Sequence, residues 1–275
     1  AYLSAKLDMP ELRHYPGGEA LFLVDGVSVG AVSSYTFANV QANHTITVTF
    51  RGEGGVADPD DTGVSTWLNT DEHIAYLQGY SLFGPEDNIT RAEVAQIFYN
   101  LLRNKNVPIT VSFTDVEDSA WYTTAVNTLA SLGILRGVGN DQFAPERTIT
   151  RAEFTVIAMR FAVLPTGGAN IFSDISASDW FYSEVIGAVK YGWITGYTDG
   201  TFRPLNPIAR SEVTAIVNRM LARSADETYV DHHTSQVTYF SDVRYSYWAY
   251  YHIVEATTGH SYTKDNGGET WFGLI

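Results

Sequence analysis

The hydrophobic residues of this chain recur at helical spacing in three segments that lie about 60 residues apart. In each segment, apolar side chains stand at positions i, i+3, i+4 and i+7, which is the pattern of a helix with one buried face. These positions are Val94, Ile97, Phe98 and Leu101; Phe154, Ile157, Ala158 and Phe161; and Val213, Ile216, Val217 and Met220. A period of this length predicts a repeat architecture, and the three segments are called copies one, two and three.

Each apolar segment follows the same five-residue start motif, Ile-Thr-Arg-Ala-Glu, or Ile-Ala-Arg-Ser-Glu in copy three. The motif occupies residues 89–93, 149–153 and 208–212. Threonine with glutamate three residues later is a capping box, so Thr90 and Thr150 are expected to begin helices. The capping box does not require the arginine between them, and the helix dipole slightly disfavours a cation there.

The arginine of the start motif is therefore a candidate for a separate function. It is Arg91, Arg151 and Arg210 in the three copies. One interpretation is a solvated surface side chain. The other is a guanidinium that binds a carboxylate or phosphate beside a helix N-terminus. The second interpretation gains weight from copy three, where Ala209 replaces the capping threonine but the arginine is kept.

A second block, Phe-x-Asp followed by tryptophan, also recurs. It begins at Phe113, Phe172 and Phe240, and its tryptophans are Trp121, Trp180 and Trp248. In copies two and three a short predicted helix, a glycine loop and the start motif follow it. Copy one lacks this front half, whereas the block at Phe240 has no start motif after it. We therefore expect the C-terminal segment to complete copy one and to close the chain into a ring of three helix-loop-helix units.

These ordered blocks resemble the S-layer homology (SLH) family over roughly residues 71–263. The resemblance implies a mainly α, pseudo-threefold domain that binds a secondary cell-wall polysaccharide, typically one that carries ketal-linked pyruvate. It implies an extracellular protein that is anchored non-covalently to the bacterial surface, with binding grooves between the units that use the arginine of the start motif. Copy one departs from the family pattern at residues 81–85, where the Asp-Gly loop is missing.

The first 52 residues are β in character. Residues 45–50 alternate polar and apolar side chains, and residues 21–24 precede a turn at Asp25-Gly26. Residues 35–46 resemble the end of the small β repeats of bacterial surface proteins, which act as spacers. The expected organisation is a β module fragment at 1–52, a linker at 53–70, copies at 71–108, 109–164 and 165–223, an insertion at 224–239, and a closing segment at 240–275.

Composition limits the partners. The chain of 275 residues carries a net charge of −14, which argues against nucleic acid and requires a local cationic pocket for any anionic ligand. Cysteine is absent, so no disulfide or thiolate chemistry is available. No apolar run is long enough for membrane insertion. Since the chain starts within a pattern, we expect it to be the C-terminal part of a longer precursor. We also expect a monomeric module.

The candidate carbohydrate-binding residues are one from each copy at four repeat positions. They are Arg91, Arg151 and Arg210; Glu93, Glu153 and Glu212; Trp121, Trp180 and Trp248; and Gly79, Gly137 and Gly196. The tryptophans are either core residues or groove walls, the glutamates are explained by capping, and the glycines either admit a ligand or provide a turn with positive φ. The aspartates of the second block, Asp115, Asp174 and Asp242, are expected to cap loops.

We expect no enzyme, no cofactor and no metal. Asp141 and Asp199 lack the ligand loop that calcium needs, His232 and His233 are assigned to a solvated loop, and Gly267-Gly268 suggests a loose tail. The alternatives are a structural S-layer lattice protein and, less favoured, a glycan hydrolase that uses two of the start-motif glutamates.

Overall fold

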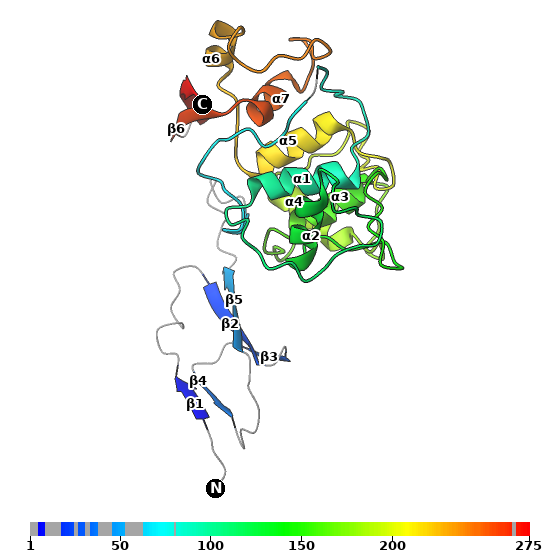
Figure 1. The fold of residues 1–275 in the computed structure, drawn as a ribbon, viewed down its shortest axis with the longest axis vertical. Helices are drawn as coiled ribbons and strands as arrows, with labels where there is room; N and C mark the ends of the chain where they lie inside the picture. The colour runs from blue at the N-terminus through cyan, green and yellow to red at the C-terminus, as the bar shows by residue number, and fades with distance from the viewer. Residues whose placement is uncertain are drawn as a thin grey trace. The chain divides into compact units, whose positions relative to one another are not determined.

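The computed structural model describes the backbone of five strands within residues 1–52, and residues 63–79, 81–265 and 268–275 (Figure 1). The chain forms two compact units, Ala1–Ala57 and Asp58–Ile275. In the first unit, β1 (Ala5–Asp8) pairs with β4 (Ser34–Phe37). A second sheet places β2 (Gly18–Val24) between β3 (Val27–Gly30) and β5 (Ile46–Gly52), with antiparallel pairing. β2 and β5 contain the two predicted strands, whereas the predicted turn at Asp25-Gly26 lies outside the described residues.

The second unit is mainly α, as the repeat pattern predicts. Its elements are α1 (Arg91–Leu101), α2 (Thr123–Ser131), α3 (Arg151–Met159), α4 (Tyr182–Lys190), α5 (Arg210–Met220), α6 (Glu227–His232), α7 (Tyr250–Thr257), β6 (His260–Asp265) and β7 (Gly268–Leu274). The start motifs begin α1, α3 and α5. Each of these helices packs against the short helix of the following block, in the pairs α1–α2, α3–α4 and α5–α7.

Capping starts the three long helices. In copy one, Thr90 Oγ1 accepts the amide of Glu93 at 3.2 Å, and the Glu93 carboxylate accepts the amide of Thr90 at 2.8 Å. Thr150 and Glu153 form the same box. In copy three, Ala209 has no hydroxyl, but the Glu212 carboxylate still accepts its amide at 3.0 Å. The glutamate therefore caps all three helices, and the threonine caps two of them.

The isoleucines of the start motifs form a closed ring of backbone hydrogen bonds. The amide of Ile89 donates to the carbonyl of Ile208, that of Ile208 to Ile149, and that of Ile149 to Ile89, each at 3.1 Å. All three side chains are fully buried. Because each copy donates to one neighbour and accepts from the other, the three helix starts meet at one centre and no copy lies at an end.

The C-terminal block supplies the missing half of copy one. The Asp242 carboxylate accepts the amides of Phe83 and Gly84 at 2.9 and 2.7 Å. Asp115 and Asp174 bind their own loops in the same way, through the amide pairs Phe143–Ala144 and Phe202–Arg203. The predicted loop-capping role of the aspartates is therefore observed, and in copy one the cap comes from a segment about 160 residues away.

The recurrent glycines make room for the phenylalanine of the second block. A Cβ atom on Gly79 would lie 2.3 Å from the Phe240 ring, and one on Gly196 would lie 2.2 Å from the Phe172 ring. On Gly137 it would lie 2.6 Å from the Gln142 carbonyl oxygen and 2.8 Å from the Phe113 ring. The positive-φ interpretation holds for Gly196 (φ 73°) but not for Gly79 or Gly137.

Two expectations for the C-terminal third are wrong. His232 ends the helix α6 instead of lying in a loop, and the supposed loose tail contains the paired strands β6 and β7. A separate apolar cluster holds these elements together. It consists of the buried side chains of Val230, Val237, Val254 and Trp271. Among the described residues, no helix has both the length and the apolar character that crossing a membrane requires.

Replacing Gly79 by alanine tests the closure. We expect Gly79→Ala to lower the free energy of unfolding by about 1–3 kcal/mol, because the added methyl group must displace the buried Phe240 ring. Chemical denaturation measures the change. Gly273→Ala is the matched control, since its Cβ would meet no atom within 4 Å. Equal stability of the two variants would show that Phe240 does not pack on copy one.

Candidate functional site

The three start-motif arginines are buried, so their interpretation as solvated surface residues is wrong. Arg91, Arg151 and Arg210 are 6, 5 and 9 % exposed. Each Nε donates to the carbonyl oxygen of a loop phenylalanine in the next copy around the ring, and the guanidinium lies over the ring of the same residue. The acceptors are Phe143, Phe202 and Phe83, at 2.7, 2.9 and 2.9 Å. Each arginine therefore ties the start of its helix to the loop of a neighbouring copy.

The backbone amides at these helix starts are also used inside the protein. In copy one, the amides of Arg91 and Ala92 donate to the carbonyls of Arg147 and Pro145, at 3.0 and 2.9 Å. Copies two and three repeat this pattern with the next loop around the ring. A ligand can therefore meet the side chains around the helix starts, but the first-turn amides are already occupied.

The arginines differ in their carboxylate partners. Arg151 pairs with Glu212 at 3.0 Å, and Arg210 pairs with Glu93. The equivalent partner of Arg91 is Glu153, but Glu153 pairs with Arg147 at 2.7 Å instead. Within the part of the chain that the structure describes, no carboxylate lies at ion-pair distance from Arg91. The three copies thus have equivalent backbones, but their arginines do not have equivalent carboxylate partners.

Arg91 lies in a locally cationic region. Its Nη2 donates to the carbonyl of Arg136 at 2.7 Å. Burial, followed by repulsion from Arg147 and, more weakly, from Arg160, lowers the pKa of Arg91 to about 10. Glu153 and Asp115 oppose this shift only in part. In a chain of net charge −14, this is a locally cationic environment of the kind that an anionic ligand would require.

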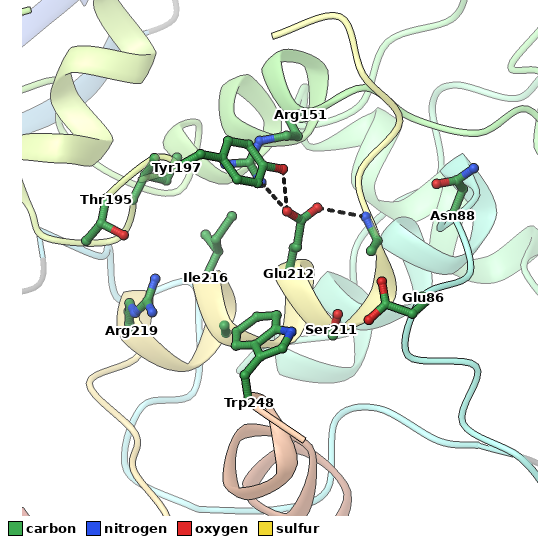
Figure 2. A pocket seen from close by; sticks show the side chains of 14 residues that line it. Glu86, Asn88, Arg151, Thr195, Tyr197, Ser211, Glu212, Ile216, Arg219 and Trp248 are labelled. Carbon is green, nitrogen blue, oxygen red and sulfur yellow. Dashed lines mark hydrogen bonds and ion pairs between the residues drawn. The ribbon is translucent and has the colours of Figure 1, made fainter. Parts of the chain in front are cut away.

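One groove of about 550 Å³ lies between copies two and three and the C-terminal block. Figure 2 shows Trp248 on one side of it and Tyr197 with Arg151 on the other, with Glu212 and Ile216 between them. The Glu212 carboxylate accepts the Tyr197 hydroxyl at 2.5 Å. Burial and then this hydrogen bond raise the pKa of Tyr197 to about 12, so the phenol stays neutral and donates.

A second groove of about 570 Å³ lies around the loop of copy one. Its lining includes Arg210, Glu93 and the loop-capping Asp242, and it shares Glu86 and Asn88 with the first groove. Both grooves depend on the closing segment, because that segment contributes Trp248 to the first and Asp242 to the second.

The three repeat tryptophans are exposed, which rules out the core interpretation. Trp121, Trp180 and Trp248 are 56, 63 and 57 % exposed, whereas Trp193 is fully buried. Trp248 lines the first groove together with Arg219, which stands nine residues after the start-motif Arg210. Arg160 follows Arg151 at the same distance. One copy earlier in the chain, Trp180 and Arg160 correspond to Trp248 and Arg219. The repeat therefore predicts that Trp180 and Arg160 lie near Arg91.

The structure brings together only part of the predicted set. Arg151, Glu212, Gly196 and Trp248 line the first groove. Arg210 and Glu93 line the second, while Gly79 and Gly137 face phenylalanine rings. Tyr197, Arg147, Arg160 and Arg219 were missed. The recurrence of arginine at 160 and 219 was a usable signal, because both residues stand nine positions after the start-motif arginine, at the C-terminal end of its helix.

The fold defines a helical repeat module whose three copies close into a ring, with grooves between the copies. The S-layer homology domain family matches residues 76–95, 112–155 and 171–214. The chain therefore carries an S-layer homology domain, which is a cell-surface anchoring module, and the family resemblance seen in the repeat motifs is confirmed. This places the chain outside the cell, at the bacterial surface.

Known relatives share this domain. A cellulosome-anchoring protein of Acetivibrio thermocellus is 36% identical over 214 residues, which is 73% of this chain and 46% of that protein. Cell surface glycoprotein 1 of the same organism is 34% identical over 74% of this chain and 9% of its own length. An amylopullulanase of Thermoanaerobacterium thermosulfurigenes is 34% identical over 56% of this chain and 9% of its own length. This chain thus spans less than half the length of these relatives.

The burial of the arginines predicts a structural effect. We expect Arg151→Ala to lower the free energy of unfolding by about 3–5 kcal/mol, because it leaves the Glu212 carboxylate without its cation. Arg103→Ala is the matched control, since its ion pair with Asp71 is exposed and should contribute less than about 1 kcal/mol. Denaturant titration of both variants makes the comparison. An equal small loss would mean that Arg151 is not a tie between copies.

Proposed function

We propose that this chain anchors an exported protein to the bacterial cell wall without a covalent bond, by binding an acidic secondary cell-wall polysaccharide in the grooves between its copies. The observation that carries the proposal is the exposure of Trp121, Trp180 and Trp248 at one repeat position. A large aromatic side chain exposed at the same position in every copy is available to a ligand, and an indole face suits the apolar C–H face of a sugar.

The grooves supply the polar contacts that a sugar needs. The first groove offers a carboxylate, a neutral phenol and the guanidinium of Arg219 around the apolar side chain of Ile216. This mixture of apolar walls and few polar groups is typical of small-ligand sites. Because Arg151 and Glu212 already neutralise each other, this groove suits an uncharged sugar residue.

The acidic substituent is assigned to the region around Arg91. Arg91 is not ion-paired to any described carboxylate, and it lies near the cations Arg147 and Arg160. A forked guanidinium in a partly dry site is well suited to a carboxylate, such as that of a pyruvate ketal. Repeat equivalence places Trp180 beside it, so one polymer could meet an aromatic face and a cation at the same groove.

The start-motif glutamates support binding better than hydrolysis. Glu93, Glu153 and Glu212 each cap a helix and each pair with an arginine. A glycosidase acid needs a raised pKa. At Glu153, burial is the largest influence and raises the pKa, but the hydrogen bonds from Arg147 and the Thr150 amide and the charges of Arg147 and Arg91 together lower it. A lattice-forming S-layer protein would use the same polysaccharide contact and differ in the segment attached to the module.

Arg147 offers a test that leaves the buried arginines in place. Arg147→Asn makes copy two resemble copy three, where Asn206 stands at the equivalent position, and lets Glu153 pair with Arg91. We expect this variant to bind native pyruvylated wall polysaccharide about tenfold or more weakly, because the carboxylate of the ligand must compete with Glu153. Calorimetric titration measures the affinity, and Arg103→Asn is the control for loss of one exposed arginine.

The same titration with polymer from which mild acid has removed the pyruvate separates the two parts of the proposal. Treated polymer should bind the parent chain and Arg147→Asn equally and weakly. If the parent binds native and treated polymer alike, the Arg91 assignment is wrong although the polysaccharide proposal stands. If native polymer does not bind at all, the anchoring proposal itself fails.

The tryptophans provide an independent prediction. Trp180→Ala should weaken binding of both native and treated polymer, because it removes the aromatic face instead of the charge contact. Its effect on the free energy of unfolding should stay below about 1 kcal/mol, since the side chain is exposed. Phe272→Ala removes an aromatic side chain of similar exposure outside the grooves. Loss of binding in both variants would point to a non-specific aromatic effect.

A further inference from the structure

Four buried side chains with metal-binding atoms meet at a place that the carbohydrate proposal does not use. His73, Glu255, His260 and Glu269 each direct one ligand atom into the cluster, and these atoms all lie within 4.8 Å of one another. The four residues are 3, 0, 1 and 8 % exposed. His73 lies at the start of copy one, whereas the other three residues lie on α7, β6 and β7.

The spacing of these atoms matches a four-coordinate site. Nδ1 of His73 lies 2.9 Å from Nε2 of His260, 3.0 Å from Glu269 Oε2 and 3.5 Å from Glu255 Oε1. Nε2 of His260 lies 3.6 Å from an oxygen of each glutamate. In a tetrahedron with bonds of about 2.0–2.1 Å, neighbouring ligand atoms lie about 3.3 Å apart. A single ion at the centre would therefore reach all four side chains with small adjustments.

Several of these atoms lack a hydrogen bond of good geometry. Neither oxygen of Glu255 accepts one, nor does Oε2 of Glu269, although the latter lies 3.0 Å from Nδ1 of His73 and 3.6 Å from Nε2 of His260. Buried carboxylate oxygens without partners are rare in folded proteins, because desolvation of the charge is not compensated. All of these oxygens face the histidine nitrogens, so a ligand at the centre of the cluster would satisfy them together.

The orientation of His260 leaves a lone pair at the centre of the cluster. Nδ1 of His260 lies 2.9 Å from the carbonyl oxygen of Thr258, so it carries the hydrogen and donates, and a neutral ring then has its lone pair on Nε2. The ring stacks on Trp271 at 3.6 Å, and His73 stacks on Tyr262 at 3.7 Å. Such outer contacts fix the orientation of metal-binding histidines.

The charge balance also leaves room for a cation. Two carboxylates lie in the cluster, and the nearby cation is Arg223, which is buried and donates to the carbonyls of Asn69, Glu72 and Ile74. Two ionised carboxylates and one guanidinium together keep a negative charge, so a cation at the centre of the cluster would be attracted electrostatically.

We propose that His73, Glu255, His260 and Glu269 bind one divalent transition-metal ion in a closed, structural site, and that zinc fits it best. Two nitrogen and two oxygen ligands in a tetrahedron suit zinc, whereas calcium and magnesium prefer sites built from oxygen atoms. The ion would join the start of copy one to the C-terminal hairpin, where the amide of His260 already donates to the carbonyl of His73 at 3.0 Å. The metal would therefore connect copy one to the C-terminal segment that completes it.

Metal analysis of the intact chain tests this proposal. The chain, dialysed first against a chelator and then loaded with Zn²⁺, should retain one zinc per molecule. With free zinc about 100-fold above its Kd, the Tm should rise by about 5–10 °C over the metal-free chain, and Mg²⁺ should not reproduce this rise. Loading with Co²⁺ should give the intense visible absorption of a tetrahedral site. A chain that retains no zinc, or whose Tm and cobalt spectrum are indifferent to the metals, would overturn the proposal.

Variants locate the site. Glu269→Gln keeps the shape of the side chain but should abolish retention of zinc and the zinc-dependent rise in Tm. His232→Gln, which changes an exposed histidine at the end of α6, should leave both unchanged. If Glu269→Gln does not fold, the stoichiometry and cobalt spectrum of the parent chain still decide the question. Zinc retention equal to that of the parent in Glu269→Gln would place the metal elsewhere and refute the assignment.

Discussion

The ring of hydrogen bonds among Ile89, Ile149 and Ile208 is the constraint on which the rest of the domain depends. Three backbone amides can close such a ring only if each helix start approaches the centre from an equivalent direction. The first-turn amides then bind the next loop, and the start-motif arginine reaches the carbonyl of a loop phenylalanine. The arginine is thus kept in every copy for a reason that helix capping does not supply: it ties each helix to the loop of its neighbour.

Closure of the ring also builds the candidate binding surface. The last block places Phe240 on Gly79, Asp242 on the loop of copy one and Trp248 in the groove beside copy three. A chain that failed to close would lose a groove wall as well as a packing surface. Folding and ligand binding therefore draw on the same contacts, and a connection between copy one and the C-terminal segment, such as the proposed metal ion, would support both.

The sequence predicted most of the helical architecture because its signals are local or periodic. Capping boxes, apolar spacing and the displaced block at Phe240 are all visible in one chain. The burial of Arg91 could not be predicted from the sequence. Its hydrogen-bond acceptors are the backbone carbonyls of Phe143 and Arg136, which lie about 50 residues away and carry no sequence signature. The four-residue cluster was missed for a similar reason. His73 is separated from His260 by 187 residues, and only the folded ring brings them together.

A single repeat position explains why equivalent backbones carry unequal charges. The residue whose carbonyl accepts the first helical amide is Asp87, Arg147 or Asn206 in the three loops. Only arginine can attract the capping glutamate, so Glu153 turns to Arg147 and leaves Arg91 without a carboxylate, whereas Glu93 and Glu212 stay with Arg210 and Arg151. The backbone tolerates this difference because the contact at that position uses the carbonyl and not the side chain. A repeat can thus keep its packing in all copies while one exposed residue decides which buried arginine lacks a carboxylate partner, and the proposed anion contact rests on that difference.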